Sequence, residues 1–463
     1  MKVLLINPPY VRDMYANSKL SQSTWNNPPL APAALAATLR EKHDVRILDL
    51  NVENEPMPSL QKMLADFHPD YAGITFTTPS FFRMTEIAAA IKKFDGQIVI
   101  IGGGAHASSL PEETLAQTKL DIVVRGEGEN ILPKIVAGND LAAIPGITFK
   151  AQGGIHANPP ATLIQDIDLL PFPAWDLYDL SRYPNARMVS RYNPAGFFET
   201  SRGCVYNCVY CNKTVFGKTF RAKSPRRVVD EMKFMLASGF REIHVIDDGF
   251  STDMKRAKAV CDLILSEKLA VTWNLQNGLR VDRVDEELIR KLSEAGCYRV
   301  TFGIESGNEQ ILKNIRKDIT LEMARNAVGW AKKYGMEVFG YFMLALPGET
   351  VQTMQDTIDL SRDLDFDYAK FTIMIPLPAT EIYNAWKKEG FLKDINWDHF
   401  HFHTQAGDCY THPTLDWETI HRYYTKSFRS FYLRPSFIAK RALKGIRNGD
   451  IFSDIYHFVK TKW

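Results

Sequence analysis

The chain has 463 residues, of which 45% are hydrophobic and 24% charged, and its formal net charge is +2. This composition is ordinary for a packed protein, so it excludes a disordered chain, a collagen and a disulfide-rich mini-protein. A charge so close to zero also argues against a nucleic-acid binder that works by neutralising phosphates. The length predicts two or three domains.

The chain begins with a short apolar run, Met1–Ile6, that leads directly into Asn7-Pro8-Pro9. The run is too short for a signal peptide, and no later apolar run approaches the roughly 18–20 residues that span a bilayer. We therefore expect a cytoplasmic protein. Its six cysteines should then be reduced thiols that are available to metals, not to disulfides.

Residues 1–144 alternate short β-branched apolar runs with helical patterns. The predicted strands are Lys2–Asn7, Asp44–Leu50, Tyr71–Thr77, Gln97–Gly102 and Asp121–Arg125. The predicted helices between and after them are Ala31–Glu41, Leu60–Asp66, Ser80–Phe94, Pro111–Gln117 and Asn130–Val136. This order indicates a doubly wound, Rossmann-like parallel sheet, which binds its ligand beyond the carboxyl ends of the strands.

Residues 145–195 read as an extended linker because they hold Gly153-Gly154, Pro159-Pro160 and Pro171-Phe172-Pro173. A second alternating series follows over residues 196–400. Its predicted strands are Gly196–Thr200, Glu242–Asp247, Val271–Gln276, Tyr298–Ile304, Val338–Leu344 and Tyr368–Ile375. Six β/α units spaced in this way favour a partial (β/α)6 barrel of the TIM type, with its chemistry at the carboxyl ends of the strands.

Three cysteines follow the first of these strands with C-x3-C-x2-C spacing: Cys204, Cys208 and Cys211. Structural zinc requires a fourth ligand, and the other cysteines, at 261, 297 and 409, are dispersed. Iron–sulfur cubanes are normally held by four thiolates, so three indicate a cluster with one iron open to a further ligand. Structural thiols and zinc are the alternatives.

This motif, in this position, resembles the signature of the radical S-adenosylmethionine (SAM) superfamily. The resemblance implies that Cys204, Cys208 and Cys211 hold a 4Fe–4S cluster whose open iron binds SAM. Reductive cleavage of SAM would then give a 5′-deoxyadenosyl radical. Tyr210 is similar to the family's aromatic residue near the adenine.

The resemblance places further SAM-binding residues at the strand ends. Asp247 and Asp248 match positions that accept hydrogen bonds from the SAM ammonium group, and Glu305 matches one near its ribose or amino group. Gly348 lies in a turn like the one flanking the adenine, and Arg280 would face the carboxylate. The alternatives are a helix cap for the Asp pair, a structural hydrogen bond for Glu305 and a surface ion pair for Arg280.

The first domain resembles the cobalamin-binding domain of one radical SAM branch. The matching residues, expected to bind cobalamin, are Thr75, Thr77, Thr78, Gly102, Gly103, His106 and Glu127. The stretch Asp13–Ser18 lacks the histidine of classical cobalamin proteins, so cobalamin would bind without a protein histidine ligand on cobalt, or not at all. A dinucleotide site at Gly102–Ala107 is disfavoured because no acidic strand end follows it.

The last region, residues 401–463, is expected to be helical, basic and aromatic. Residues 422–463 hold ten Lys or Arg and two Asp, a net charge of +8. Ile420, Tyr424, Phe428 and Phe431 recur at helical spacing. They predict either a helical cap that closes the open barrel or an amphipathic contact with a membrane surface.

The resemblance implies a cobalamin-dependent radical SAM methyltransferase that methylates an unactivated carbon of a small-molecule or lipid-like substrate. It also implies an external low-potential electron donor of the flavodoxin or ferredoxin type, and no nucleic-acid partner. Two alternatives remain open. One is a ring-forming enzyme like the anaerobic magnesium-protoporphyrin monomethyl ester cyclase or the hopanoid enzymes, and the other is a non-catalytic iron–sulfur or corrinoid-binding protein.

Overall fold

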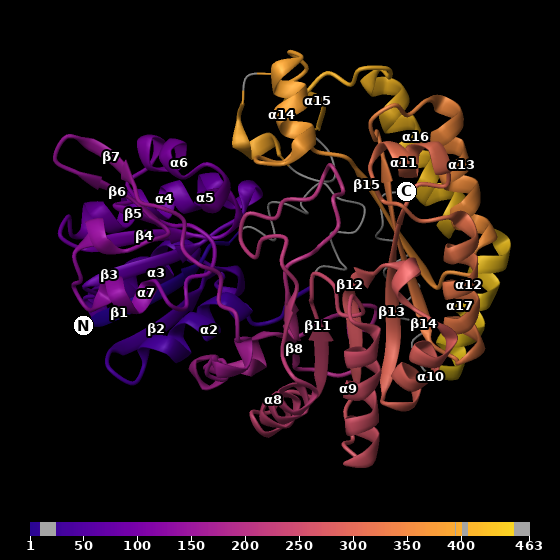
Figure 1. Cartoon of the computed structure of the whole chain (residues 1–463), viewed down its shortest axis with the longest axis horizontal. Coiled ribbons are helices and arrows are strands. Elements are labelled where there is room, and N and C mark those ends of the chain that lie inside the picture. Colours follow the sequence, from indigo (N-terminus) through magenta and orange to yellow (C-terminus); the bar gives the residue numbers. More distant parts are fainter. Residues whose placement is uncertain (10–24, 394, 401–405, 449–463) are drawn as a thin grey trace.

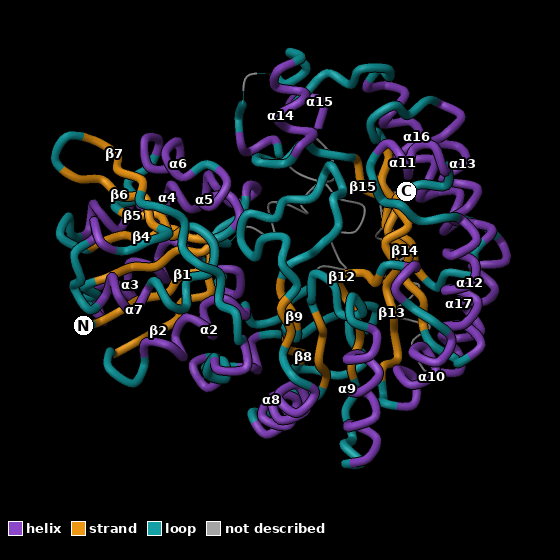
Figure 2. The backbone as a smooth tube through the Cα atoms, in the orientation of Figure 1, coloured by secondary structure: helices purple, strands orange, loops and turns teal. Residues whose placement is uncertain are grey.

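The computed structural model describes residues 1–9, 25–393, 395–400 and 406–448. They form two α/β lobes that lie side by side, with the last described residues on the second lobe (Figure 1). The stretch Asp13–Ser18 lies outside the described residues. Figure 2 shows loops from both lobes gathered where the lobes meet, which is the region that holds the site described below.

The first lobe is built on a seven-stranded sheet with the order β2-β1-β3-β4-β5-β6-β7. Its first five strands are parallel: β1 (Lys2–Asn7), β2 (Asp44–Asp49), β3 (Tyr71–Thr75), β4 (Val99–Gly103) and β5 (Ile122–Val124). All residues of β1 after Lys2 are buried, as expected for a strand covered by helices on both faces. The helices are α2 (Leu30–Leu39), α3 (Pro56–Phe67), α4 (Phe81–Phe94), α5 (Ala105–Ser109), α6 (Pro111–Gln117) and α7 (Leu132–Val136).

The segment expected to be an extended linker contains a hairpin, which corrects that prediction. Strands β6 (Ile147–Ala151) and β7 (Gly154–Ala157) pair antiparallel and add to the edge of the first sheet, with Ile122 opposite Phe149. The buried residues Ile147, Thr148 and Phe149 extend the core of that sheet. Gly153 and Gly154 make the turn at φ 97° and 131°, so the glycines that suggested a linker serve a hairpin.

The second lobe is a six-stranded parallel sheet with the order β15-β14-β13-β12-β11-β8, curved into an open barrel. Its strands are β8 (Ala195–Phe198), β11 (Glu242–Val245), β12 (Trp273–Leu279), β13 (Cys297–Glu305), β14 (Glu337–Leu344) and β15 (Tyr368–Ile373). The helices are α8 (Pro225–Ala237), α9 (Met254–Ser266), α10 (Glu286–Glu294), α11 (Glu309–Asn314), α12 (Leu321–Lys333), α13 (Val351–Asp363) and α14 (Glu381–Lys388). The predicted fold class is therefore confirmed for both lobes.

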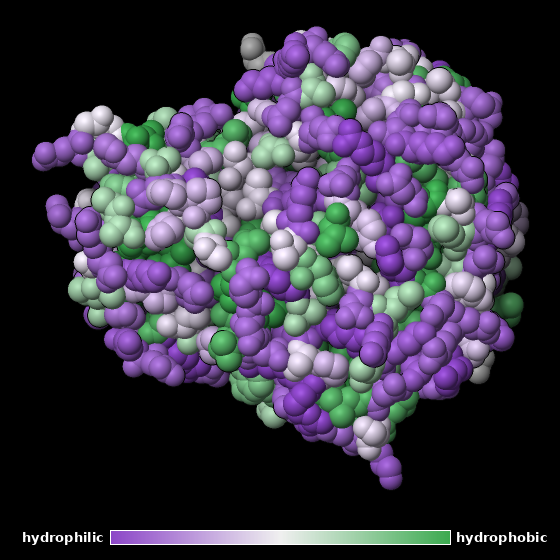
Figure 3. Space-filling model, viewed as in Figure 1, coloured by the Kyte–Doolittle hydropathy of each residue, from purple (hydrophilic) through white to green (hydrophobic). Residues whose placement is uncertain are grey.

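The C-terminal region is helical, with α15 (Ala406–Cys409), α16 (Trp417–Tyr432) and α17 (Pro435–Asn448). The four periodic residues Ile420, Tyr424, Phe428 and Phe431 are buried, and the ring of Phe428 lies 5.4 Å from that of Phe371 on β15. This packing confirms α16 as a cap beside the last barrel strand. Among the described residues no helix is long and apolar enough to cross a membrane. In Figure 3 the visible face is mostly hydrophilic, with apolar side chains in separate small patches.

Candidate active site

The cysteine loop, residues 203–220, lies between two short antiparallel strands, β9 (Ser201–Arg202) and β10 (Arg221–Ala222). Gly203 begins the loop at φ 80°, and a Cβ there would come within 2.2 Å of the Thr219 carbonyl oxygen. Backbone hydrogen bonds hold the loop, from Cys204 N to Gly217 O at 3.4 Å and from Val209 N to Ile315 O at 3.2 Å. The loop is thus fixed at its base and in its middle.

Cys208 and Cys211 lie in contact. The hydrogen bond from Cys211 lowers the pKa of the Cys208 thiol to about 6, and the positive charges of Lys317 and Arg280 act in the same direction. The Arg280 guanidinium lies 4.0 Å from the Cys208 sulfur. Thiolates are the form that binds metal, so these groups favour the ligand form of Cys208. Among the described residues no three His, Cys, Asp or Glu side chains are gathered as a single-ion site.

Arg280 lies beside the cysteine loop, with partners that the sequence did not reveal. Its guanidinium stacks 3.7 Å from the centre of the Tyr206 ring, pairs with Asp282 at 2.9 Å and donates to the Lys317 carbonyl at 2.5 Å. These contacts fix the side chain next to Cys208. The sequence suggested a surface ion pair for Arg280, and its pair with Asp282 is only one of these contacts.

Glu305 ends β13 with a left-handed backbone, φ 69°, and its side chain is 11% exposed. It accepts from Lys317 Nζ at 2.9 Å and from the hydroxyl of Tyr210. Lys317 follows α11 and belongs to no motif, so sequence reasoning missed it. Gly348 lies in the turn after β14 at φ 80°, where a Cβ would come within 2.7 Å of the Asn314 amide. Tyr210, Glu305 and Lys317 therefore form one connected group beside the cysteines.

The two aspartates after β11 have different roles. Asp247 is buried and accepts hydrogen bonds from Thr200 N, Thr200 Oγ1 and Ser201 Oγ at 2.5–2.7 Å. Its carboxylate therefore fixes the end of β8 and the start of the cysteine loop. Asp248 is exposed to the space between the lobes and accepts from Gly203 N at 3.1 Å. Neither residue is the N-cap of α9, because Asp253 holds that position.

A cavity of about 480 Å³, which we name the junction cavity, lies at the carboxyl ends of the first sheet and reaches the barrel. The predicted residues Thr75, Thr77, Gly102, Gly103 and Glu127 line it, together with Arg202 and Asp248 from the second lobe. A Cβ on Gly102 would come within 2.5 Å of Leu120, and one on Gly103 would meet no protein atom closer than 4.0 Å. The backbone at Gly103 is therefore open to a ligand that approaches closely.

Thr78 and His106 are not among the residues that line the junction cavity. They bond to each other, His106 Nδ1 to Thr78 Oγ1, at 3.1 Å. The imidazole packs against Phe81 and Trp397, with ring centroids 4.7 and 4.9 Å away. Burial lowers the pKa of His106 to about 4, so the ring is neutral at physiological pH. The structure thus separates His106 from the other residues expected at the cofactor.

A buried ion cluster joins the lobes, and we name it the Arg202 cluster: Glu127, Glu129, Glu199, Arg202 and Arg221. Arg202 pairs with Glu127 at 2.8 Å and with Glu129 and Glu199 at 2.6 Å, and Arg221 pairs with Glu127 at 2.7 Å. Glu127 also accepts from the Ile164 backbone at 2.8 Å. The Glu127 carboxylate is therefore engaged in holding the lobes together through Arg202, which lies one residue before the glycine that begins the cysteine loop.

Two family models match the chain: the radical SAM superfamily over residues 198–361 and the B12 binding domain over residues 24–136. The chain is 34% identical to an uncharacterized methyltransferase of Pyrococcus horikoshii over 96% of this chain and 98% of the relative. It is 28% identical to the cytidylyl-2-hydroxyethylphosphonate methyltransferase of Streptomyces wedmorensis over 84% and 82% of the two chains.

The solved structure of the radical SAM methyltransferase TsrM from Kitasatospora setae aligns with a TM-score of 0.69 and 22% identity. That alignment covers 84% of this chain and 75% of TsrM. OxsB, a cobalamin-dependent SAM radical enzyme, aligns with a TM-score of 0.74 and 18% identity over 99% of this chain and 72% of OxsB. At these identities the likeness concerns the fold alone, and it extends over both lobes of this chain.

Proposed function

This chain belongs to the family of cobalamin-dependent radical SAM methyltransferases, and we propose that it methylates a carbon atom of a small molecule bound between its two lobes. The family's cofactors are a 4Fe–4S cluster, SAM and cobalamin. When bound, they supply a 5′-deoxyadenosyl radical and a transferable methyl group, while the protein positions them and excludes competing reactions. One observation carries the proposal: the junction cavity of the first lobe is lined by Arg202 and Asp248, which adjoin the cysteine loop.

We assign Cys204, Cys208 and Cys211 to the cluster. The contact between Cys208 and Cys211, and the cations Arg280 and Lys317 beside them, suit a centre held by thiolates. For SAM we assign Tyr210, Asp248, Arg280, Glu305 and Gly348. Asp247 supports the same site indirectly, because its three hydrogen bonds fix Thr200 and Ser201 ahead of the loop.

We assign residues 1–144, together with the β6–β7 hairpin, to cobalamin binding through Thr75, Thr77, Gly102 and Gly103. Closely approachable glycine backbone and threonine hydroxyls suit a large planar ligand with polar edges. Thr78 and His106 support the binding surface from outside the lining of the junction cavity. Glu127 contributes through its ion pairs in the Arg202 cluster. Because the His106 ring packs among aromatic side chains, we propose that cobalamin binds here without a histidine ligand from this position.

The experiment is anaerobic reconstitution of the full chain with iron, sulfide and hydroxocobalamin, followed by SAM and a reductant. We expect cluster and corrin absorption and release of 5′-deoxyadenosine. The Cys208→Ser variant should lose the cluster and the nucleoside but keep the corrin spectrum, since its change lies outside the first lobe. Iron-free protein, or undiminished nucleoside release by the variant, would contradict the proposal. With an accepted substrate, a mass gain of one CH2 distinguishes methylation from cyclisation.

Two partners complete the proposal. We propose a low-potential flavodoxin- or ferredoxin-type electron donor, since reductive SAM cleavage consumes an electron. We also propose that α17 contacts an anionic membrane surface. The side chains of Leu443 and Ile446 on this helix are 70% and 67% exposed, within a region of net charge +8. A basic helix with exposed apolar side chains suits such a surface, which would bring a lipid-like substrate within reach.

A further inference from the structure

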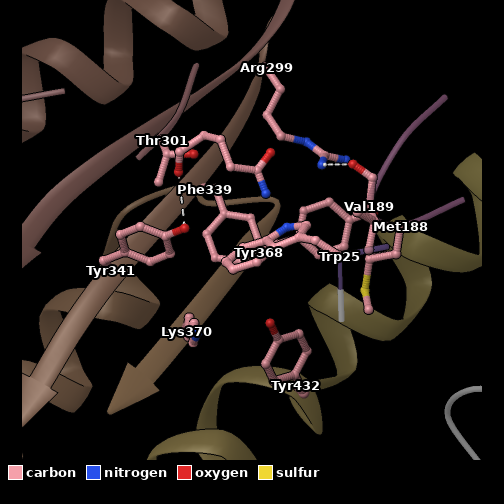
Figure 4. A pocket seen from close by; sticks show the side chains of 11 residues that line it. Trp25, Met188, Val189, Arg299, Thr301, Phe339, Tyr341, Tyr368, Lys370 and Tyr432 are labelled. Atoms are coloured by element: carbon pink, nitrogen blue, oxygen red, sulfur yellow. Dashed lines mark hydrogen bonds between the residues drawn. The ribbon is translucent and has the colours of Figure 1, made fainter. Parts of the chain in front are cut away.

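The segment 410–415 links α15 to α16 and lies against the carboxyl ends of the last two barrel strands. The Tyr410 hydroxyl donates to the backbone oxygen of Met374, the residue after β15, at 2.7 Å. Farther along the chain, the Tyr432 hydroxyl of α16 donates to the backbone oxygen of Ala369 on β15 at 2.7 Å. Figure 4 shows Tyr432 among the side chains that line a cavity of about 50 Å³ in the barrel. The C-terminal region is therefore anchored to the last strand at two places.

The turn after β14, residues 345–349, adjoins the cysteine loop, and we name it the β14 turn. The side-chain amide of Asn314 donates to the backbone oxygen of Pro347 in this turn at 3.3 Å. The residue that follows Asn314 accepts from Val209 N in the cysteine loop at 3.2 Å. Gly348, which we assign to SAM, is part of the β14 turn. Two consecutive residues thus connect this turn to the loop that carries the cluster ligands.

His412 joins the segment 410–415 to the β14 turn. The residue is 4% exposed, and its Nδ1 accepts from the backbone N–H groups of Thr414 and Leu415 at 3.2 and 3.1 Å. A ring nitrogen that accepts a hydrogen bond carries no proton, so the neutral ring has its proton on Nε2. Nε2 lies 3.4 Å from the backbone oxygen of Leu346 and therefore donates to it.

The surroundings of His412 keep its ring neutral and oriented. Burial lowers the pKa of the imidazole, while the carbonyl groups of Leu346 and Ala345 act in the opposite direction. The ring meets Trp386 edge-on, with the centroids 5.9 Å apart. One tautomer is thus held between two backbone segments.

The β14 turn receives two further hydrogen bonds that fix its shape. Glu349 is buried, and its Oε2 accepts from Leu346 N at 3.0 Å. Thr414 Oγ1 donates to the backbone oxygen of Glu349 at 2.7 Å. Leu346 is therefore held at its N–H by Glu349 and at its C=O by His412.

Such a turn can recognise a purine through its backbone. The edge of adenine presents ring-nitrogen acceptors and an amino donor, which are complementary to backbone N–H and C=O groups. Recognition of this kind requires the turn to be held within about 0.5 Å of the productive geometry by its supporting residues. His412 and Thr414 supply that support from a region outside the barrel strands.

We propose that His412 is a positioning residue, which fixes the β14 turn in the conformation that receives the adenine of SAM. The C-terminal region then takes part in cofactor binding through this one imidazole. The inference rests on the proposed function, because it takes the ligand beside Gly348 to be SAM.

Two substitutions separate the two hydrogen-bonding roles of the ring. His412→Asn keeps an acceptor at the position of Nδ1 but is too short to reach Leu346. His412→Gln places an N–H group near the position of Nε2 and keeps the donor to Leu346. His421→Asn is the matched control, because His421 is an exposed histidine on α16 in the same region.

The first measurement is hydrogen exchange of the peptide that contains the β14 turn, followed by mass spectrometry on the cluster- and cobalamin-loaded protein without SAM. Loss of the bond to Leu346 should open the turn more often, so we expect faster exchange of this peptide in His412→Asn. His412→Gln and the control should exchange at nearly the wild-type rate.

The second measurement is ligand-observed NMR of the same proteins with SAM and with two fragments of it. Methylthioadenosine keeps the adenine, and methionine keeps the amino-acid groups. We expect His412→Asn to weaken SAM and methylthioadenosine about fivefold, the equivalent of one hydrogen bond, and to leave methionine unchanged. His412→Gln should restore most of the affinity. A merely structural role would weaken both fragments alike and would not be rescued by glutamine.

Unchanged binding of methylthioadenosine by His412→Asn, or an equal loss for methionine, would overturn the inference, as would unchanged exchange of the β14 turn. Failure of the proposed function is seen separately in the wild-type protein, as missing cluster absorption and no binding of SAM.

Discussion

Replacing Arg202 by methionine tests whether the Arg202 cluster holds the lobes together. The substitution keeps the length of the side chain but removes the guanidinium that pairs with Glu127, Glu129 and Glu199. Arg221 still neutralises Glu127, whereas Glu129 and Glu199, at 9% and 12% side-chain exposure, lose this partner. Removing one member of a buried ion pair costs about 3–5 kcal/mol because a desolvated charge is left behind. We expect a loss of stability of that size.

The assay is urea unfolding of the cofactor-free chain at pH 8, with limited proteolysis of the connection between the lobes as a second probe. Arg226→Met is the control, because Arg226 pairs with Asp230 and Glu267 at the surface and its loss should leave the urea midpoint near that of the wild type. Should the two variants unfold at the same urea concentration, the cluster does not hold the lobes together.

The loss of stability caused by Arg202→Met should depend on pH. Burial raises the pKa of Glu199 to about 7, so the folded chain keeps a proton there that the unfolded chain has released above its ordinary value near 4.5. Stability linked to Glu199 is therefore lost as the pH rises from about 4.5 through 7. Arg202 opposes this loss because its positive charge lowers the pKa of Glu199. The loss of stability caused by Arg202→Met should therefore be largest at pH 8 and smaller at pH 6.

Three further predictions concern the first lobe and the C-terminal region. Gly103→Leu should place a side chain in the junction cavity and weaken hydroxocobalamin binding at least tenfold in equilibrium dialysis, with unchanged circular dichroism; unaltered binding would locate the corrin elsewhere. His106→Gln should leave the electron paramagnetic resonance spectrum of bound cob(II)alamin unchanged, since the ring packs against Phe81 and Trp397, whereas loss of a nitrogen coupling would make it a ligand. Leu443→Glu should reduce sedimentation with anionic vesicles severalfold but not alter recovery with neutral ones, and equal sedimentation of the variant and the wild type would exclude α17 as the contact.

Local patterns in the sequence were sufficient for most helices and strands and for the cysteine triad, although they missed the β6–β7 hairpin. Apolar runs such as Lys2–Asn7 and Val338–Leu344 form strands within a residue of the predicted bounds. The first of these strands is buried on both faces after Lys2, which requires a nearly unbroken apolar run. The helical spacing of Ile420, Tyr424, Phe428 and Phe431 likewise predicted the buried face of α16. The C-x3-C-x2-C run pointed to an iron–sulfur centre before any contact was known.

Only the tertiary structure decided which polar side chains face a ligand and which serve the framework. Glu127 lies 75 residues from Arg202 and 94 from Arg221, so the cluster that engages its carboxylate has no local signature. His106 turns toward Trp397, and Lys317 meets Glu305 across the barrel end. A hydrogen bond or ion pair depends on where two groups lie in space, whereas sequence spacing reports only the periodicity of one strand or helix. The residues that line the junction cavity were therefore fixed by the packing of one lobe against the other.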